Sequence, residues 1–211
     1  MTIRHHISDD LLMAYAAGAL PEAFALVLAT HVSMCDDCRA ALAGFEAVGG
    51  AMLDASDQIE MDEGSLDRVF SRLDAPVKAR STRPAGILPL PLQDYIGGDL
   101  SAVKWRSLGM GVRQAILPTE GVGSARLLYI PAGQSVPDHG HRGLELTLVL
   151  QGAFRDKTDR FGPGDMEIAT EALQHTPVAE AGPACICLAA TDAKLRFNGL
   201  IPRLAQQFMG I

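Results

Sequence analysis

The chain has 211 residues and a formal net charge of −7, a length that allows one large domain or two modest ones. The charge is uneven, because residues 1–85 carry seven Lys/Arg against thirteen Asp/Glu (net −6) and residues 86–211 carry eleven against twelve (net −1). An acidic surface repels phosphates, so the first part of the chain argues against direct binding of nucleic acid and favours a basic protein as partner.

Membrane and secretory segments are not indicated. The apolar stretch from Leu11 to Met34 is interrupted at Pro21 and Glu22, so neither side is long enough to span a bilayer. No charged-then-apolar signal segment opens the chain. We therefore expect a cytoplasmic protein, and the four cysteines fit that reducing compartment, where Cys-x-x-Cys indicates metal binding or redox chemistry before a structural disulfide.

Three short helices are predicted at the start of the chain. Ser8 is a candidate N-cap for a helix over residues 9–19, with two aspartates at its positive end. A second helix begins at Pro21, and a third begins near residue 36 and ends before the glycines at 49 and 50. Three helices of this size make a thin core, for which a structural zinc ion is a usual remedy.

The junction of the second and third helices carries metal-ligand residues. His31 falls on the last turn of the second helix with Cys35 one turn further, and residues four apart share a face. Cys35 and Cys38 form a Cys-x-x-Cys pair whose thiolates can hold one small ion. Zinc needs a fourth nitrogen or sulfur ligand to complete its tetrahedron, and the candidates are His5 and His6, between which spacing does not choose.

A fourth helix is predicted after an acidic, polar stretch (residues 54–63), with Ser65 as its cap. Its apolar residues fall at i, i+3, i+4 and i+7 and form one stripe: Leu66, Val69, Phe70 and Leu73. Packing on the first three helices is the ordinary interpretation of such a stripe. The alternative is docking to a partner, because the acidic spacer would let this helix stand away from the bundle. We take the stripe as a candidate partner-binding surface.

The composition and periodicity of the sequence change after residue 74. Residues 74–93 are rich in proline and basic side chains and show no periodicity, which predicts a semi-stiff linker too loose to couple the two halves by packing. Short β-rich runs broken by Gly and Pro follow and predict a small antiparallel barrel or jelly roll. The predicted fold class is α+β in two domains: a helical zinc-binding domain over residues 1–75, a linker over 76–93, and an all-β domain over 94–211.

A second set of ligand-type residues lies in the β region. His139 and His141 are two apart and so point to one side of a strand, and Glu145 returns to that side across a turn. His175 on a later strand would complete a set of three histidines and one carboxylate, which suits zinc and also manganese, iron or nickel.

The first three of these residues, with Gly133 and Gly152, match the first motif of the cupin superfamily position for position. The second cupin motif is partly present. Gly164 and His175 resemble its glycine and its histidine ligand, but residues 170–172 replace the usual Pro-x-Gly and Ala179 replaces the trailing asparagine. This departure argues against a catalytic cupin, and no catalytic residue is predicted.

Two further cysteines, Cys185 and Cys187, flank Ile186 in an apolar run and would share one face of a strand. Buried free cysteine usually behaves as a small hydrophobe, so we expect a packing role. A redox role is the alternative.

The two ligand sets together, in a short acidic helical domain joined by a linker to a cupin, resemble the ChrR-type zinc-binding anti-sigma factors over almost the whole chain. The resemblance implies that His6, His31, Cys35 and Cys38 bind the first zinc and that His139, His141, Glu145 and His175 bind the second metal. It implies an extracytoplasmic-function sigma factor as partner, whose RNA polymerase-binding surfaces the helical domain hides. It also implies release by a stress signal, in particular an oxidative one, through the cupin.

Two other functions are compatible with parts of the sequence. A metal-dependent cupin dioxygenase or isomerase with a zinc-stabilised helical appendage would need open positions on its metal. A DNA-binding zinc module would need a positive surface, which the N-terminal charge does not provide. On the anti-sigma interpretation, the loose linker predicts that residues 1–85 inhibit the sigma factor by themselves.

Overall fold

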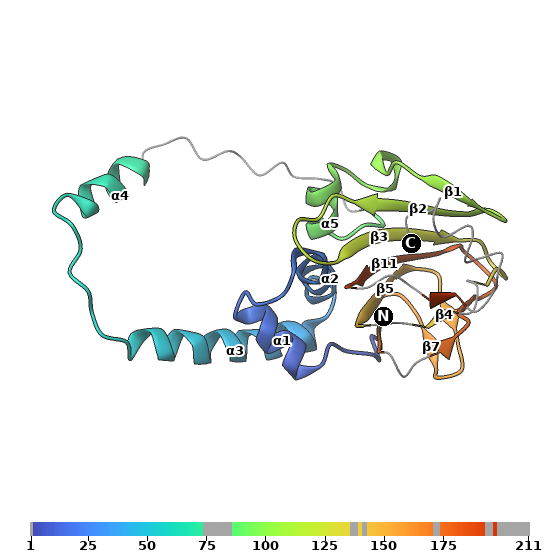
Figure 1. The fold of residues 1–211 in the computed structure, drawn as a ribbon, viewed down its shortest axis with the longest axis horizontal. Helices are drawn as coiled ribbons and strands as arrows, with labels where there is room; N and C mark the ends of the chain where they lie inside the picture. Colours follow the sequence, from blue (N-terminus) through green and yellow to red (C-terminus); the bar gives the residue numbers. More distant parts are fainter. Residues whose placement is uncertain are drawn as a thin grey trace.

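The computed structural model describes residues 2–73, 86–135, 139–140, 143–170, 174–192 and 196–197 (Figure 1). Its helices come first in the chain: α1 (Asp9–Ala16), α2 (Glu22–Val32), α3 (Asp36–Asp54), α4 (Ser65–Leu73), α5 (Leu90–Ile96) and the 3-10 turn η1 (Leu100–Ala102). The predicted α+β fold, with a helical N-terminal region and a β domain after it, is confirmed. None of the helices described is both long and apolar enough to cross a bilayer.

The β domain consists of antiparallel sheets. The main sheet has the order β1-β2-β3-β11-β5-β8, formed by β1 (Arg106–Gly109), β2 (Val112–Leu117), β3 (Ser124–Ile130), β11 (Cys185–Thr191), β5 (Glu145–Gln151) and β8 (Met166–Ala169). Two three-stranded sheets complete the described part of the β domain. One has the order β10-β6-β7, from β10 (Val178–Ala179), β6 (Phe154–Arg155) and β7 (Arg160–Phe161). The other has the order β12-β4-β9, from β12 (Arg196–Phe197), β4 (His139–Gly140) and β9 (Gln174–His175).

The boundaries of the first and third helices differ from the prediction. α1 ends at Ala16 rather than at residue 19, because Gly18 adopts the left-handed conformation (φ 66°) that terminates helices. α3 does not stop before Gly49 and Gly50 but continues to Asp54. A helical glycine costs only about 1 kcal/mol relative to alanine, and the good helix formers of residues 51–53 carry the helix past both.

α2 is covered on nearly every side, with seven buried residues among eleven. One of its sides faces α1 and α3, and another packs against the main sheet at β3, β5 and β11 (Figure 1). Phe24 and Leu28 of α2 belong to the same buried cluster as Leu146 of β5 and Leu188 of β11. The expectation that the two halves are joined only by a loose linker is therefore wrong, since they share one apolar core.

The last residues expected to be linker are helical instead. α5 begins at Leu90, and its Leu92 is fully buried together with Leu88 just before it. The Gln93 side chain donates a 2.7 Å hydrogen bond to the carbonyl of Leu88, and the Tyr95 hydroxyl donates to Glu22 of α2 at 3.2 Å. The chain is thus already packed on the helical region before the first strand begins.

α4 is separate from this core. Figure 1 shows it away from the sheet and from α1–α3, beyond the far end of α3. None of its residues is buried. Its apolar stripe therefore does not pack on the first three helices.

Candidate metal centre

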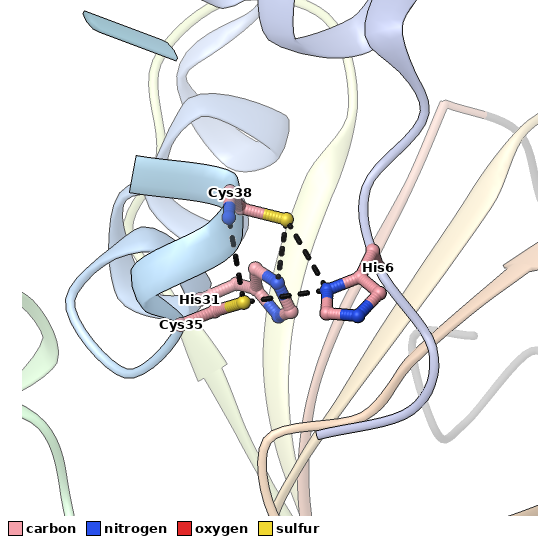
Figure 2. Close-up of side chains that lie close together, drawn as sticks. All are labelled: His6, His31, Cys35 and Cys38. Carbon is pink, nitrogen blue, oxygen red and sulfur yellow. Dashed lines mark hydrogen bonds between the residues drawn. The ribbon is translucent and has the colours of Figure 1, made fainter. Parts of the chain in front are cut away.

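Four side chains from three parts of the chain converge at the end of α2 (Figure 2). His31 lies on the last turn of α2, Cys35 precedes α3 and acts as its N-cap, and Cys38 lies in the first turn of α3. The Sγ of Cys35 accepts a hydrogen bond from the Cys38 backbone N–H at 3.5 Å, which orients the Cys-x-x-Cys loop. The fourth member, His6, comes from the extended N-terminal segment.

The structure distinguishes the two N-terminal histidines. The His6 Nδ1 lies 3.3 Å from the Sγ of Cys35 and 3.7 Å from the Sγ of Cys38. The His5 ring points the other way, onto Phe161 with 4.4 Å between ring centroids and toward Asp159 at 3.1 Å. Of the two candidates that spacing left open, His6 therefore joins the cluster.

The cluster has the dimensions of a tetrahedral metal site. The candidate ligand atoms all lie within 4.8 Å of one another, and the His31 Nε2 is 3.3 Å from the Sγ of Cys38. Zinc–sulfur and zinc–nitrogen bonds of about 2.3 and 2.0 Å in a tetrahedron require ligand separations of roughly 3.5 Å. Two imidazoles and two thiolates are a donor set that zinc prefers, so the group could hold a metal ion.

Burial sets the protonation of this site. It lowers the pKa of His31 to about 4, with the neighbouring His6 acting in the same direction, while the carbonyl of Gly164 opposes both. His31 is therefore neutral at pH 7 and offers a lone pair. Burial also raises the pKa of the Cys38 thiol to about 11; the Ile7 backbone N–H opposes this and the Cys35 thiol adds to it. A metal must therefore displace the Cys38 proton on binding.

The second predicted set lies in the β domain. The backbones of His139 on β4 and His175 on β9 are paired directly opposite each other, although 36 positions separate them. Glu145, the first residue of β5, is buried and accepts a 3.3 Å hydrogen bond from the Thr147 hydroxyl. His141 lies outside the described residues, and of His139 and His175 the structure describes only the backbone.

Cys185 and Cys187 lie side by side on β11, as the strand pattern predicted, with 3.4 Å between their sulfur atoms. Both are buried. The hydrogen bond with Cys185 and burial raise the pKa of Cys187 far above its ordinary value. A protonated, buried thiol is a poor nucleophile, which favours the packing role.

The candidate partner-binding residues are exposed to solvent in the part of the chain that the structure describes. The exposed fractions of Leu66, Val69, Phe70 and Leu73 are 65, 52, 56 and 68%. A second group of exposed apolar residues, separate from α4, lies on the second half of α3: Val48, Met52 and Leu53. Met52 and Leu53 lie beyond the predicted end of this helix, before Gly49, and were therefore not predicted to lie on it.

Comparison with known proteins identifies the family. Residues 93–194 match the model of the ChrR cupin-like domain. The chain is 61% identical to the anti-sigma-E factor ChrR of Cereibacter sphaeroides, with full coverage of both chains. This chain belongs to the ChrR family of anti-sigma factors. The predicted resemblance is thereby confirmed, and the anti-sigma interpretation is favoured over the cupin-enzyme alternative.

A solved structure of a ChrR protein is similar over most of the chain. It is the crystal structure of Rhodobacter sphaeroides SigE in complex with the anti-sigma ChrR, with 62% identity and a TM-score of 0.82. The match covers 90% of this chain and all of that one. The ChrR fold thus includes both the helical region and the β domain, and the β domain described above is its cupin.

Proposed function

We propose that this chain binds an extracytoplasmic-function sigma factor in the cytoplasm and hides the surfaces by which that factor binds RNA polymerase. The observation that carries the proposal is the stripe on α4, whose four large apolar side chains are all more than half exposed on a helix with no buried residue. An amphipathic helix that buries nothing against its own chain leaves its apolar face for a partner. The partner-binding residues are Leu66, Val69, Phe70 and Leu73.

Two further observations support a sigma factor as the occupant. The related ChrR protein was crystallised with SigE, and this chain covers all of that ChrR chain at 62% identity. The net charge of −6 on residues 1–85 favours a partner with a basic surface. The proposed sigma-binding region is the helical domain, residues 1–75, with no direct contact to DNA.

Zinc is the proposed metal at His6, His31, Cys35 and Cys38. A site with four protein ligands is closed and has no position for substrate, so its role is to hold the N-terminal segment, α2 and α3 together. The thiolates are also oxidisable, which would give the site a chemical response of its own.

The cupin is the proposed sensor. Its metal, zinc or one of manganese, iron and nickel, would be held by His139, His141, Glu145 and His175. A stress signal that changes the occupancy or geometry of this site can weaken sigma binding only if the cupin is coupled to the helices. The shared core of α2 with β5 and β11 provides a direct mechanical connection, and α2 carries His31.

The proposal is tested by measuring the affinity of the full-length chain for a purified SigE-type sigma factor. Phe70→Ala is expected to weaken binding by at least about tenfold, because a large apolar anchor is removed from an interface. The melting temperature of the free variant should stay unchanged, since Phe70 is 56% exposed.

Val122→Ala is the matched control, because Val122 is 68% exposed but lies in the cupin. It should leave both quantities unchanged. Equal binding by the Phe70 variant and the wild type would contradict the assignment of α4 as the docking helix.

A further inference from the structure

The N-terminal segment of residues 2–7, called here the strap, lies along the edge of the cupin before it reaches the metal cluster. The backbone N–H groups of Arg4 and His5 donate hydrogen bonds of 2.7 and 3.0 Å to Oδ1 of Asp165. The carbonyl of His5 accepts a 3.1 Å hydrogen bond from the backbone N–H of Met166 at the start of β8. The residue after this contact is His6.

Asp165 belongs to the tight turn between β7 and β8, and its two carboxylate oxygens have different partners. Oδ2 accepts a 2.8 Å hydrogen bond from Gly162 in the same turn, while Oδ1 accepts both strap donors. The residue is only 4% exposed. Burial alone would raise the pKa of Asp165, but the three backbone donors more than offset it, and the net pKa is lowered. The carboxylate is thus charged and shared between the turn and the strap.

Ile3 of the strap packs against Gly164 in this turn. A side chain at Gly164 would place its Cβ 2.6 Å from Ile3, so the absence of a side chain lets the strap approach. Arg4, His5 and His6 also line an open pocket of about 590 Å³, together with Met166 and Ile168 of β8. The strap is thus held by these backbone bonds, by the His5 ring on Phe161 and by Ile7, which is 5% exposed in the core.

We propose that Asp165 of the cupin is a positioning residue for the metal centre: by fixing the backbone of Arg4 and His5 it places His6 against Cys35 and Cys38. This inference rests on the proposed metal-binding function of the cluster. Residues outside the ligand shell that orient metal ligands typically change metal affinity by about 10- to 100-fold when they are altered. Here the orienting group comes from the sensor domain, so any change in the β7–β8 turn is transmitted to a ligand of the other domain.

The test uses the full-length, zinc-loaded chain and two variants that break the contact from opposite sides. Asp165→Asn removes the charge and one acceptor. Arg4→Pro removes a backbone donor of the strap, together with the Arg4 side chain, and leaves the cupin turn intact. Thr2→Pro is the matched control, because it introduces the same ring two residues before the first donor. Asp159→Asn is the second control, since Asp159 contacts the His5 ring but not the strap backbone.

Two quantities are measured for each protein: amide hydrogen exchange of residues 3–6, and the rate at which a chelator exposes Cys35 and Cys38 to alkylation, read by mass spectrometry of that peptide. Both test variants should lose protection in the strap and release zinc roughly 10- to 100-fold faster. The fluorescence of Trp105, the single tryptophan, should show an intact cupin.

The outcomes separate this inference from the proposed function. Unchanged zinc release in Arg4→Pro and Asp165→Asn, in a wild-type background that holds zinc, would overturn the inference alone. Equally fast release in Thr2→Pro would also overturn it, because any disturbance of the strap would then suffice. A wild-type chain that holds no zinc at Cys35 and Cys38 would overturn the metal centre itself and the inference with it.

Discussion

The ring of Phe24 on α2 lies against Gly123, which directly precedes β3, so closely that a Cβ on Gly123 would be 3.4 Å from it. This contact joins the helical region to the cupin. Phe24 is 3% exposed. It is therefore a structural element of both halves of the chain.

Phe24→Ala should lower the free energy of unfolding by about 3–5 kcal/mol, the usual cost of removing a buried aromatic ring. Because the core is shared, the loss should appear in the urea transition of Trp105 in the cupin as well as in the helical circular dichroism signal. Met13→Ala is the control, since Met13 is 55% exposed on α1. A Trp105 transition that does not move would show that the two halves unfold independently.

Removal of the proposed zinc ion at His6, His31, Cys35 and Cys38 should destabilise the whole chain. A structural zinc site contributes several kcal/mol of folding free energy, so a chelator should lower the melting temperature by roughly 10 °C or more. Cys38→Ser should reproduce the effect without chelator. Differential scanning calorimetry with zinc-saturated chelator as control measures this, and an unaltered melting profile would argue against a structural metal.

Gly152, the last glycine of the cupin motif, lies where a side chain would clash with a neighbouring strand. Its φ is +70°, and a Cβ there would lie 2.7 Å from the backbone carbonyl oxygen of Ala184. Gly152→Ala should therefore cost about 2–4 kcal/mol. Gly121→Ala is matched, because Gly121 has a φ of +77° but a methyl group there would meet nothing within 4 Å. It should cost only about 1 kcal/mol in chemical denaturation, and equal costs would refute the steric explanation.

Asp99 should make stability depend on pH. Burial would raise the pKa of Asp99, but the backbone N–H groups of Leu88, Leu100 and Ile87 more than offset this, so the folded pKa lies below its ordinary value of 3.8. A carboxylate with a depressed folded pKa stabilises the protein above the unfolded pKa, and this contribution is lost as the pH falls through the folded pKa.

Asp99→Ala should consequently lower the urea midpoint at pH 7, by about 1–2 kcal/mol in unfolding free energy. The difference from wild type should shrink below about pH 4. Asp57→Ala, at an exposed position in the acidic spacer, should show no difference at either pH. A gap between Asp99→Ala and wild type that persists at low pH would exclude the charge as its cause.

Local patterns predicted the parts of this molecule that local geometry determines. His31, Cys35 and Cys38 lie within eight positions, so helical periodicity was sufficient to bring them together. The alternation and turns of the β region were sufficient for an antiparallel β domain. The choice of His6 came from the family resemblance, because it depends on which way the strap faces.

Contacts between distant segments were not predictable in this way. A helix that is apolar on nearly all sides, as α2 is, must pack against structure on two sides, and this predicts a second layer. The sequence does not say which segment forms that layer, so the core shared with the main sheet was not predicted. The bond between the strap and Asp165 depends on backbone donors, which leave no side-chain signal. α5 was missed because prolines mask its short periodic pattern.

The separation between Arg4 and Asp165, 161 positions along the chain, has a consequence during synthesis. At about 5–20 residues per second, the strap waits on the order of 10–30 s after it is made before its anchor is translated. If Asp165 positions His6, as proposed, His6 reaches its place only after residue 165 has been translated. A translation product that ends before Asp165 would therefore lack both the acceptor for the strap and His175, which lies further along the chain.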